Sequence, residues 1–172
     1  MKPILAILFF VLSCAGVSPY RKTVPDVELE KFMGKWYVIA SRATSYEKNA
    51  FQAVEIYTFN KDKDRIDIDF TFRKGSMDGE KKSLPQKGYV IDKKNNSHWK
   101  VSPLWPLKFD YLIIGLDKDY KWTAIGVPDK EFLWIMAREP SLSETELSYI
   151  LKSIESNGYP TQNMDRIQNK KD

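Results

Sequence analysis

Short runs of β-branched and aromatic residues fill the sequence from residue 35 to residue 138, and this succession constrains the fold more than any other feature. Turn clusters rich in Gly, Asn, Asp and Pro separate the runs, and no long helical pattern occurs between Phe32 and residue 143. The runs predict about eight strands, over residues 35–43, 50–60, 64–73, 82–92, 97–102, 108–117, 120–127 and 132–138. The 172 residues therefore predict one all-β domain.

The third run shows how these strands are expected to lie. In "RIDIDFTF", Ile66, Ile68, Phe70 and Phe72 alternate with charged or polar residues, which is typical of a strand with one buried and one solvated face. The runs "YLIIGL" and "FLWIMA" are apolar on both faces. We expect a helix to cover the outer side of these last strands.

The sequence "PSLSETELSYILKSIESNGYP" predicts that helix. Ser143 and Glu146 have the spacing of a capping box, and Gly158 is placed to end the helix in the left-handed conformation. Between them an apolar stripe has helical spacing, formed by Leu147, Ile150, Leu151 and Ile154. We interpret the helix as a structural support that packs on the outside of the sheet.

Motifs at both ends of the strand region resemble those of a known family. They are "GKWY", the block "LDKDYKWTAIGVPDKEFLWIMAREP", and the capped helix that follows it; the residues that carry the resemblance are Gly34, Trp36, Asp117, Tyr120 and Arg138. In this order the motifs resemble those of the lipocalins, and within them the bacterial outer-membrane lipoprotein lipocalins. The resemblance covers nearly all of the chain after its leader. It implies an eight-stranded antiparallel up-and-down β-barrel, the lipocalin calyx, with one C-terminal α-helix packed outside.

Strand parity in such a barrel places the motifs together. The first strand starts at the end where the even-numbered strands finish, so Trp36, the "LDKDY" turn and Arg138 are expected at one end. Closure sets the last strand beside the first, which brings the Arg138 guanidinium towards the Trp36 indole. A cation–π contact of this kind contributes roughly 0.5–2 kcal/mol. The segment "PDVELEKF" is expected to cross this closed end as a short helical turn. The alternative is that Trp36 is an ordinary core residue.

The opposite end should then open into a cavity for one small ligand. The residues expected on the cavity wall are Ala40, Ile56, Ile68, Phe70, Tyr89, Trp99, Tyr111, Ile113, Ala124 and Trp134. Those expected at the mouth, where an anionic head group could be met, are Arg42, Tyr46, Arg73, Trp105 and Lys108. The apolar loop "SPLWPLKFD" either packs on neighbouring loops or forms an apolar lip that admits an acyl chain or touches a membrane. The family resemblance implies fatty acids or lysophospholipids as ligands.

The first residues resemble an export signal. Lys2 precedes the apolar run "ILAILFFVL", which is too short to span a bilayer. The sequence "VLSC" then resembles the lipobox of bacterial lipoproteins, with Cys14 as the acyl acceptor. Cleavage by ordinary signal peptidase, which would discard Cys14, is the alternative. Ala15 after the cysteine resembles lipoproteins that are sent to the outer membrane.

This pattern divides the chain into three parts. We expect a lipoprotein signal peptide over 1–13, a lipidated tether over 14–28 and the lipocalin domain over 29–172. Acyl chains such as palmitate on Cys14 would anchor the protein to the periplasmic face of the outer membrane, because stable attachment needs more than one chain. Whether two copies form a homodimer stays open, since the strand patterns show no self-complementary patch.

Other functions find less support. The net charge of +4 comes from lysines scattered among 23 acidic residues, so no basic nucleic-acid face is indicated. His98 is the sole histidine and is expected on a strand surface, and no Cys/His cluster predicts a metal site. No cofactor is expected and no catalytic residues are assigned. Two alternatives to a carrier remain: an envelope interaction protein whose barrel is filled by its own aromatic side chains, and a lipocalin-fold enzyme.

Overall fold

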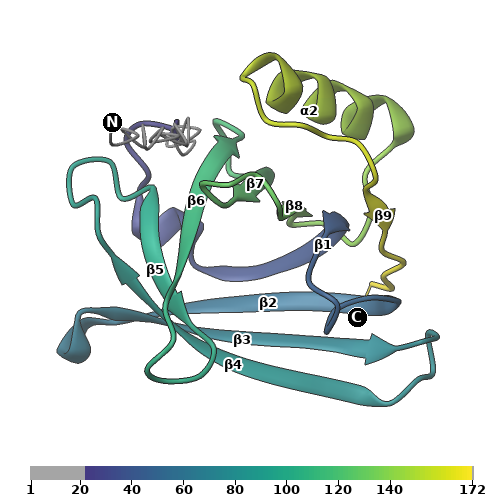
Figure 1. The fold of residues 1–172 in the computed structure, drawn as a ribbon, viewed down its shortest axis with the longest axis horizontal. Coiled ribbons are helices and arrows are strands. Elements are labelled where there is room, and N and C mark those ends of the chain that lie inside the picture. The colour runs from purple at the N-terminus through teal and green to yellow at the C-terminus, as the bar shows by residue number, and fades with distance from the viewer. Residues whose placement is uncertain (1–21, 172) are drawn as a thin grey trace, which may run out of the picture.

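The computed structural model describes residues 22–171, which fold into one antiparallel sheet with helices at its end and on its outside (Figure 1). The strands are β1 (Gly34–Arg42), β2 (Ala50–Asn60), β3 (Arg65–Lys74), β4 (Lys81–Val90), β5 (His98–Ser102), β6 (Phe109–Leu116), β7 (Trp122–Gly126), β8 (Leu133–Ala137) and β9 (Asp165–Arg166). The helices are α1 (Leu29–Phe32), the 3-10 turn η1 (Lys61–Lys63) and α2 (Glu144–Ser156).

The first eight strands close into an up-and-down barrel. Each of β2 to β8 pairs with its sequence neighbour, and β1 pairs with both β2 and β8. The short β9 adds to β1 at Ala40 and Ser41. The predicted fold class is therefore confirmed, and the predicted limits of all eight strands lie within two residues of the observed ones. Within residues 22–171, no helix is long and apolar enough to cross a membrane.

The alternation read from the third run holds in β3. Its four apolar side chains are buried inside the barrel, whereas Asp69 between them is exposed. β3 pairs along its length with the long strands β2 and β4. Apolar burial on one face and solvated polar groups on the other therefore fix the register of this part of the sheet.

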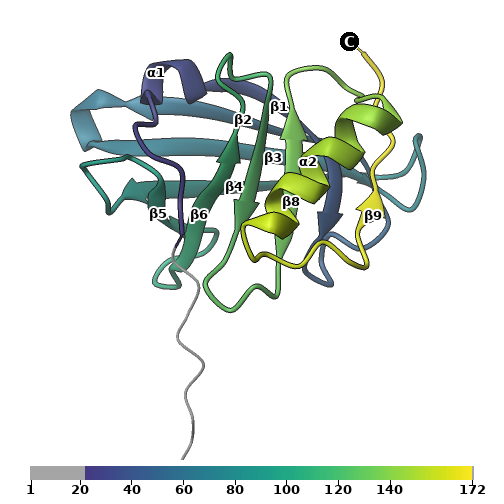
Figure 2. The same cartoon turned by 90° about the horizontal axis from the view of Figure 1, so that it is seen from above.

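Helix α2 covers the outer face of the last strands, as predicted (Figure 2). The Ser143–Glu146 capping box is present, and Leu147, Ile150 and Ile154 are buried against outward-facing residues of β6 and β8. Tyr159, just after the helix, lies so close to β7 that a Cβ at Gly126 would come within 2.7 Å of its ring. The strands that are apolar on both faces thus separate two cores, one inside the barrel and one beneath the helix.

The closed end of the barrel is built around Arg138 and Trp36. The guanidinium carbon of Arg138 lies 3.7 Å from the centre of the fully buried Trp36 ring, which is the predicted contact. Partial burial lowers the Arg138 pKa to about 10, so the group stays cationic at neutral pH. Its nitrogens donate to carbonyl oxygens from three segments: Lys31, Phe32, Lys35 and Tyr120. Arg138 therefore ties α1, β1 and the β6–β7 turn together.

The remaining motif residues hold the backbone around this contact. Gly34 has a φ of +93°, a conformation that an L side chain rarely adopts, at the point where the chain turns from α1 into β1. The Asp117 carboxylate accepts hydrogen bonds from the backbone of Asp119 and Lys121 and so fixes the β6–β7 turn. The Tyr120 hydroxyl accepts from the backbone N–H of Glu28. The short helical turn predicted before Gly34 is present as α1.

We expect Arg138→Ala to lower the free energy of unfolding by about 2–4 kcal/mol, measured by urea denaturation. The substitution removes the cation–π contact and leaves partly buried carbonyl oxygens without their charged donor. Arg166→Ala is the matched control, because Arg166 is half-exposed and forms an ion pair with the exposed Glu144. The control should change stability by less than about 1 kcal/mol. Equal effects of the two substitutions would contradict the role given to Arg138.

Candidate functional site

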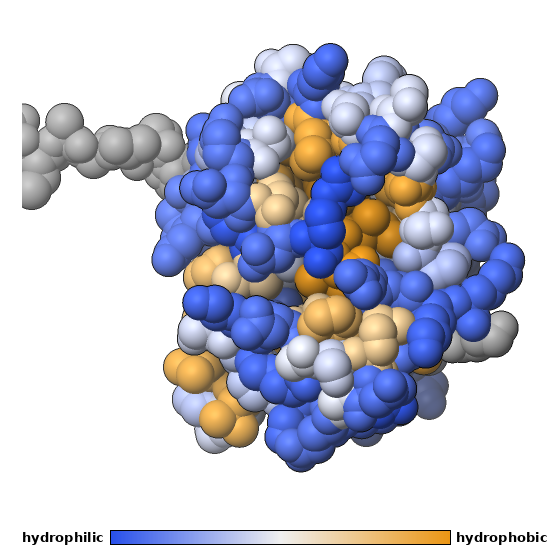
Figure 3. Space-filling model, turned by 90° about the vertical axis from the view of Figure 1, so that its right-hand side faces the viewer, coloured by the Kyte–Doolittle hydropathy of each residue, from blue (hydrophilic) through white to orange (hydrophobic). Residues whose placement is uncertain are grey.

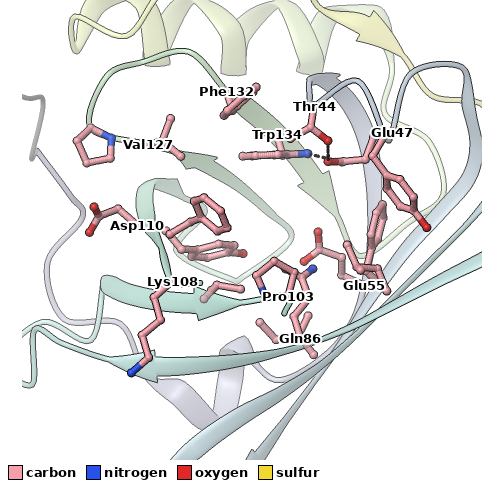
Figure 4. A pocket seen from close by; sticks show the side chains of 18 of the residues that line it. Thr44, Glu47, Glu55, Gln86, Pro103, Lys108, Asp110, Val127, Phe132 and Trp134 are labelled. Carbon is pink, nitrogen blue, oxygen red and sulfur yellow. Dashed lines mark hydrogen bonds between the residues drawn. The ribbon is translucent and has the colours of Figure 1, made fainter. Parts of the chain in front are cut away.

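A cavity of about 540 Å³ lies inside the barrel at the end opposite to Trp36. This volume falls within the ~300–1,000 Å³ typical of small-molecule sites. The wall is mostly apolar, and its residues come from β2 to β6, β8 and three loops; they include Ile68, Phe70, Leu84, Gln86, Val101, Phe109, Tyr111, Val127, Phe132 and Trp134 (Figure 4). On the face where β1 and β3 end, apolar side chains gather at the centre among hydrophilic ones (Figure 3).

Packed aromatic side chains fill the barrel below the cavity. Phe32 of α1 contacts the rings of Trp36, Tyr57 and Trp99, with ring centres 5.2–5.5 Å apart. Trp99 in turn stacks on Tyr111 at 5.1 Å. Tyr111 lines the cavity, so this stack is where the filled half meets the hollow half. The barrel is therefore neither hollow nor blocked along its whole length.

The mouth holds a carboxylate in a defined place. Glu47, in the β1–β2 loop, accepts hydrogen bonds from the Trp134 indole at 2.9 Å and from the Thr44 hydroxyl at 3.0 Å (Figure 4). Burial raises the Glu47 pKa above its ordinary value, and the two hydrogen bonds oppose this rise. The indole of Trp134 is thereby fixed against the cavity wall.

A second carboxylate lies deeper. Glu55 of β2 is 8% exposed and extends into the cavity (Figure 4). It accepts a hydrogen bond from the Tyr57 hydroxyl, which lies 2.6 Å from the Tyr111 hydroxyl. Burial raises the Glu55 pKa to about 7; the Tyr57 hydrogen bond opposes the rise and the charge of Glu47 adds to it. Burial also raises the pKa of both tyrosines, so they remain protonated donors at neutral pH.

Four of the residues expected on the wall line this cavity: Ile68, Phe70, Tyr111 and Trp134. Trp99 and Ile113 are buried inside the barrel but belong to the packed core and do not line the hollow. That these side chains touch a ligand stays a prediction.

The other four expected wall residues face outward, which corrects the predicted strand registers. Ala40 follows an irregularity in the β1–β8 pairing and is buried beneath α2, as is Ala124 of β7. Ile56 is 41% exposed on the outer face of β2, because the neighbours Ala53, Tyr57 and Phe59 take the inner face. Tyr89 also lies outside, where the Lys108 ammonium stands 4.9 Å above its ring.

Of the five residues expected at the mouth, two line the cavity and three do not. Tyr46 and Lys108 line the cavity. Arg42 does not: its guanidinium donates to carbonyl oxygens of Glu131, Pro160 and Gln162 and holds the C-terminal segment. Arg73 donates to Gly79 and faces an outer depression.

Trp105 also lies outside the cavity, at 81% exposure. Leu104, Leu107 and Phe109 beside it are exposed as well, so the apolar loop is not packed on its neighbours. His98 hydrogen-bonds Asp110 at 2.6 Å, on the strand face opposite to the buried Trp99.

Glu47 and Glu55 are the site residues that the sequence reasoning missed. The signal for Glu55 was present, since it alternates with Ala53, Tyr57 and Phe59 over "AFQAVEIYTF". Val54 and Ile56 alternate with the same period, so the pattern alone does not decide which set faces inward, and Ile56 was expected on the wall. Glu47 lies in a loop, where the alternation of apolar and polar residues does not indicate which way a side chain points.

The comparison with known families agrees with this architecture. Residues 27–169 match the family model described as "Lipocalin-like domain". The chain belongs to the lipocalin family. Among curated lipocalin relatives, it is 27% identical to the outer membrane lipoprotein Blc of Vibrio cholerae over 171 residues, which are 98% of this chain and 99% of that protein. It is 26% identical to temperature-induced lipocalin-1 of Arabidopsis thaliana over 147 residues, 80% of this chain and 77% of that one.

Solved structures show the same fold. Lobster apocrustacyanin A1 superposes with a TM-score of 0.66 at 15% identity, over 90% of this chain and 91% of that one. Insecticyanin from the tobacco hornworm Manduca sexta also gives 0.66, at 16% identity, over 91% and 87% of the two chains. At such low identity these likenesses concern the lipocalin fold alone.

The buried Glu55 predicts an unusual pH dependence of stability. Because its folded pKa of about 7 lies above the ordinary 4.5, the folded state binds a proton more tightly than the unfolded state. Stability should therefore fall as pH rises from about 4.5 to about 7, by up to about 3 kcal/mol, and then level off. Glu55→Gln should remove most of this decline in urea unfolding measured across that range, and the raised pKa of Glu47 should leave a smaller decline of the same sign.

Asp69→Asn is the control for this measurement. It removes one negative charge from the next strand, but from an exposed position on the outer face. The decline between about pH 4.5 and 7 should persist in this variant. If the wild type and Glu55→Gln show the same change of stability with pH over this interval, Glu55 does not have the raised folded pKa that its environment predicts.

Proposed function

We propose that this lipocalin is a membrane-anchored carrier that binds a small hydrophobic ligand, a fatty acid or a lysophospholipid, in the barrel cavity for lipid storage or transport in the cell envelope. The observation that carries the proposal is the cavity of about 540 Å³, with an apolar wall and few polar groups. Such a site suits an elongated apolar body with one polar end. The hollow also argues against the alternative of a barrel filled by its own aromatic side chains.

Binding, and not catalysis, is the activity that these groups support. Three polar groups of the cavity, Glu47, Glu55 and Tyr111, are held by hydrogen bonds to their neighbours. Lipid carriage needs an apolar hollow and a fixed mouth, and the hydrogen bonds from Trp134 and Thr44 to Glu47 supply the latter. We therefore propose no catalytic role for any of them.

The N-terminal leader supports an envelope location. The proposed signal peptide and the acylated Cys14 lie outside the residues that the structure describes. The relatives in Vibrio cholerae and Escherichia coli are named outer membrane lipoproteins. We propose the same location for this chain, with the protein attached to the outer membrane through palmitate and related acyl chains on Cys14.

An anchor at Cys14 would keep the mouth close to the membrane. The Lys22 ammonium donates to Asn157, just beyond α2, and Tyr159 donates to Val127 and Phe132 in the mouth loop. Cys14 and Lys22 are eight positions apart in the chain, a reach of at most about 30 Å when extended. The exposed apolar loop around Trp105 also borders the open end, so a lipid could pass between bilayer and cavity over a short path.

We expect Leu84→Trp to weaken the binding of a long-chain lipid by about tenfold or more, because the larger ring occupies part of the cavity. The affinity is measured by the saturable quenching of tryptophan fluorescence as fatty acid or lysophospholipid is added. Ile56→Trp is the matched control, since it adds the same ring to the outer face of β2. Retained affinity in Leu84→Trp, or no saturable binding by the wild type, would refute carriage in this cavity.

Radioactive palmitate should label the wild-type protein in cells and leave Cys14→Ser unlabelled. The variant should also move from the membrane fraction to the soluble fraction, because its stable anchor is lost. Since residue 14 lies outside the domain, purified Cys14→Ser should bind lipid as tightly as a soluble version of the wild type. Label that persists in Cys14→Ser would rule out this residue as the acyl acceptor.

A further inference from the structure

The floor of the cavity carries an acceptor that the protein itself does not satisfy. Glu55 is 92% buried, and one carboxylate oxygen, Oε2, accepts from the Tyr57 hydroxyl. Among residues 22–171, no donor reaches the other oxygen, Oε1, and the carboxylate extends into the hollow (Figure 4). Because this oxygen borders the hollow and is not sealed inside the protein, a donor from outside the chain can reach it.

The charges around the hollow are unfavourable to an anion. Glu47 lies on the same wall nearer the mouth, and its negative charge opposes the ionisation of Glu55. Of the charged residues at the rim, Asp110 already pairs with Lys100 and His98, and the Lys108 ammonium lies over the outer Tyr89 ring. Asp129 adds a further carboxylate there. A carboxylate group carried to the floor would meet Glu55 without a cation beside it.

The two tyrosine hydroxyls at the floor use their protons within the protein. The hydroxyls of Tyr57 and Tyr111 lie 2.6 Å apart, and Trp99 stacks beneath Tyr111. Tyr57 donates its one proton to Glu55, so Tyr111 donates to Tyr57, and the atoms that the floor presents to a ligand are acceptors: the second Glu55 oxygen and the Tyr111 oxygen. An acyl chain that entered with its methyl end first would leave the second Glu55 oxygen without a donor.

We propose that Glu55, with Tyr57 and Tyr111, is a recognition site for the polar end of the ligand, and that it takes an uncharged or cationic hydrogen-bond donor, a hydroxyl or an ammonium, in preference to a carboxylate. The lipid then binds with its head group at the floor and its chain towards the mouth. This inference rests on the proposed function and specifies it: of the two ligand classes named there, head groups that carry an amine or a hydroxyl are favoured over free fatty acids.

The test compares dodecylamine, dodecanol and dodecanoate, which share one chain and differ in the head group. Each competes for purified protein with an uncharged fluorescent naphthylamine probe, at about pH 8.5, where Glu55 and dodecanoate are ionised. The wild type should bind the amine and the alcohol about tenfold more tightly than the carboxylate. In Glu55→Gln this preference should disappear, because the amide is uncharged and can itself donate to a carboxylate.

Asp69→Asn serves as the control, because it removes the same charge from the outside of the barrel and should keep the wild-type preference. Equal binding of all three head groups by the wild type, or an unchanged preference in Glu55→Gln, would overturn this inference and leave lipid carriage intact. If neither the probe nor any of the three compounds binds, the proposed function itself fails. The two failures are thus distinguishable.

Discussion

The contact between Arg138 and Trp36 is the interaction on which the rest of the structure depends. A single guanidinium covers the indole at 3.7 Å and donates hydrogen bonds to carbonyl oxygens of α1, β1 and the β6–β7 turn. These segments meet only when the last strand has come back beside the first, so the contact forms together with closure of the barrel. Aromatic rings then pack above it and fill one half of the interior, which leaves the hollow at the other end.

Helix α2 adds a second apolar core, so the domain can stay stable although only half of its barrel interior is filled. β6 and β8 bury side chains on both faces, inward to the barrel and outward to α2 and Tyr159. Apolar area is thus buried outside the barrel as well as inside it, and burial of this kind is the main source of folding free energy. The domain therefore does not need a completely packed barrel for stability. The folded domain can therefore keep a cavity and remain stable, although the unfilled volume still lowers the free energy of unfolding.

Much of the fold can be predicted from the sequence, because its patterns are local or depend only on whether a strand is odd or even in the barrel. The alternation over "RIDIDFTF", the capping box at Ser143 and the positions of Trp36 and Arg138 identify strand, helix and closed end without knowledge of register. The cavity wall was harder, because it depends on registers that tertiary packing decides. An irregular pairing after Val38 turned Ala40 outward, and the larger rings of Tyr57 and Phe59 put Ile56 outside. Arg42 holds a distant C-terminal segment that no local pattern connects to it.

Glu55 shows why the residue that breaks the pattern is informative. A glutamine there would keep the shape and avoid the cost of ionising a buried group, and it would suit a cavity that only had to be apolar. The chain instead places a carboxylate whose pKa is raised to about 7 against two tyrosine hydroxyls, with one oxygen open to the hollow. Departures from local consistency of this kind are expected at functional sites, where stability is traded for recognition. The barrel accounts for the binding of a small hydrophobic ligand; under the inference above, the carboxylate decides which end of that ligand lies at the floor.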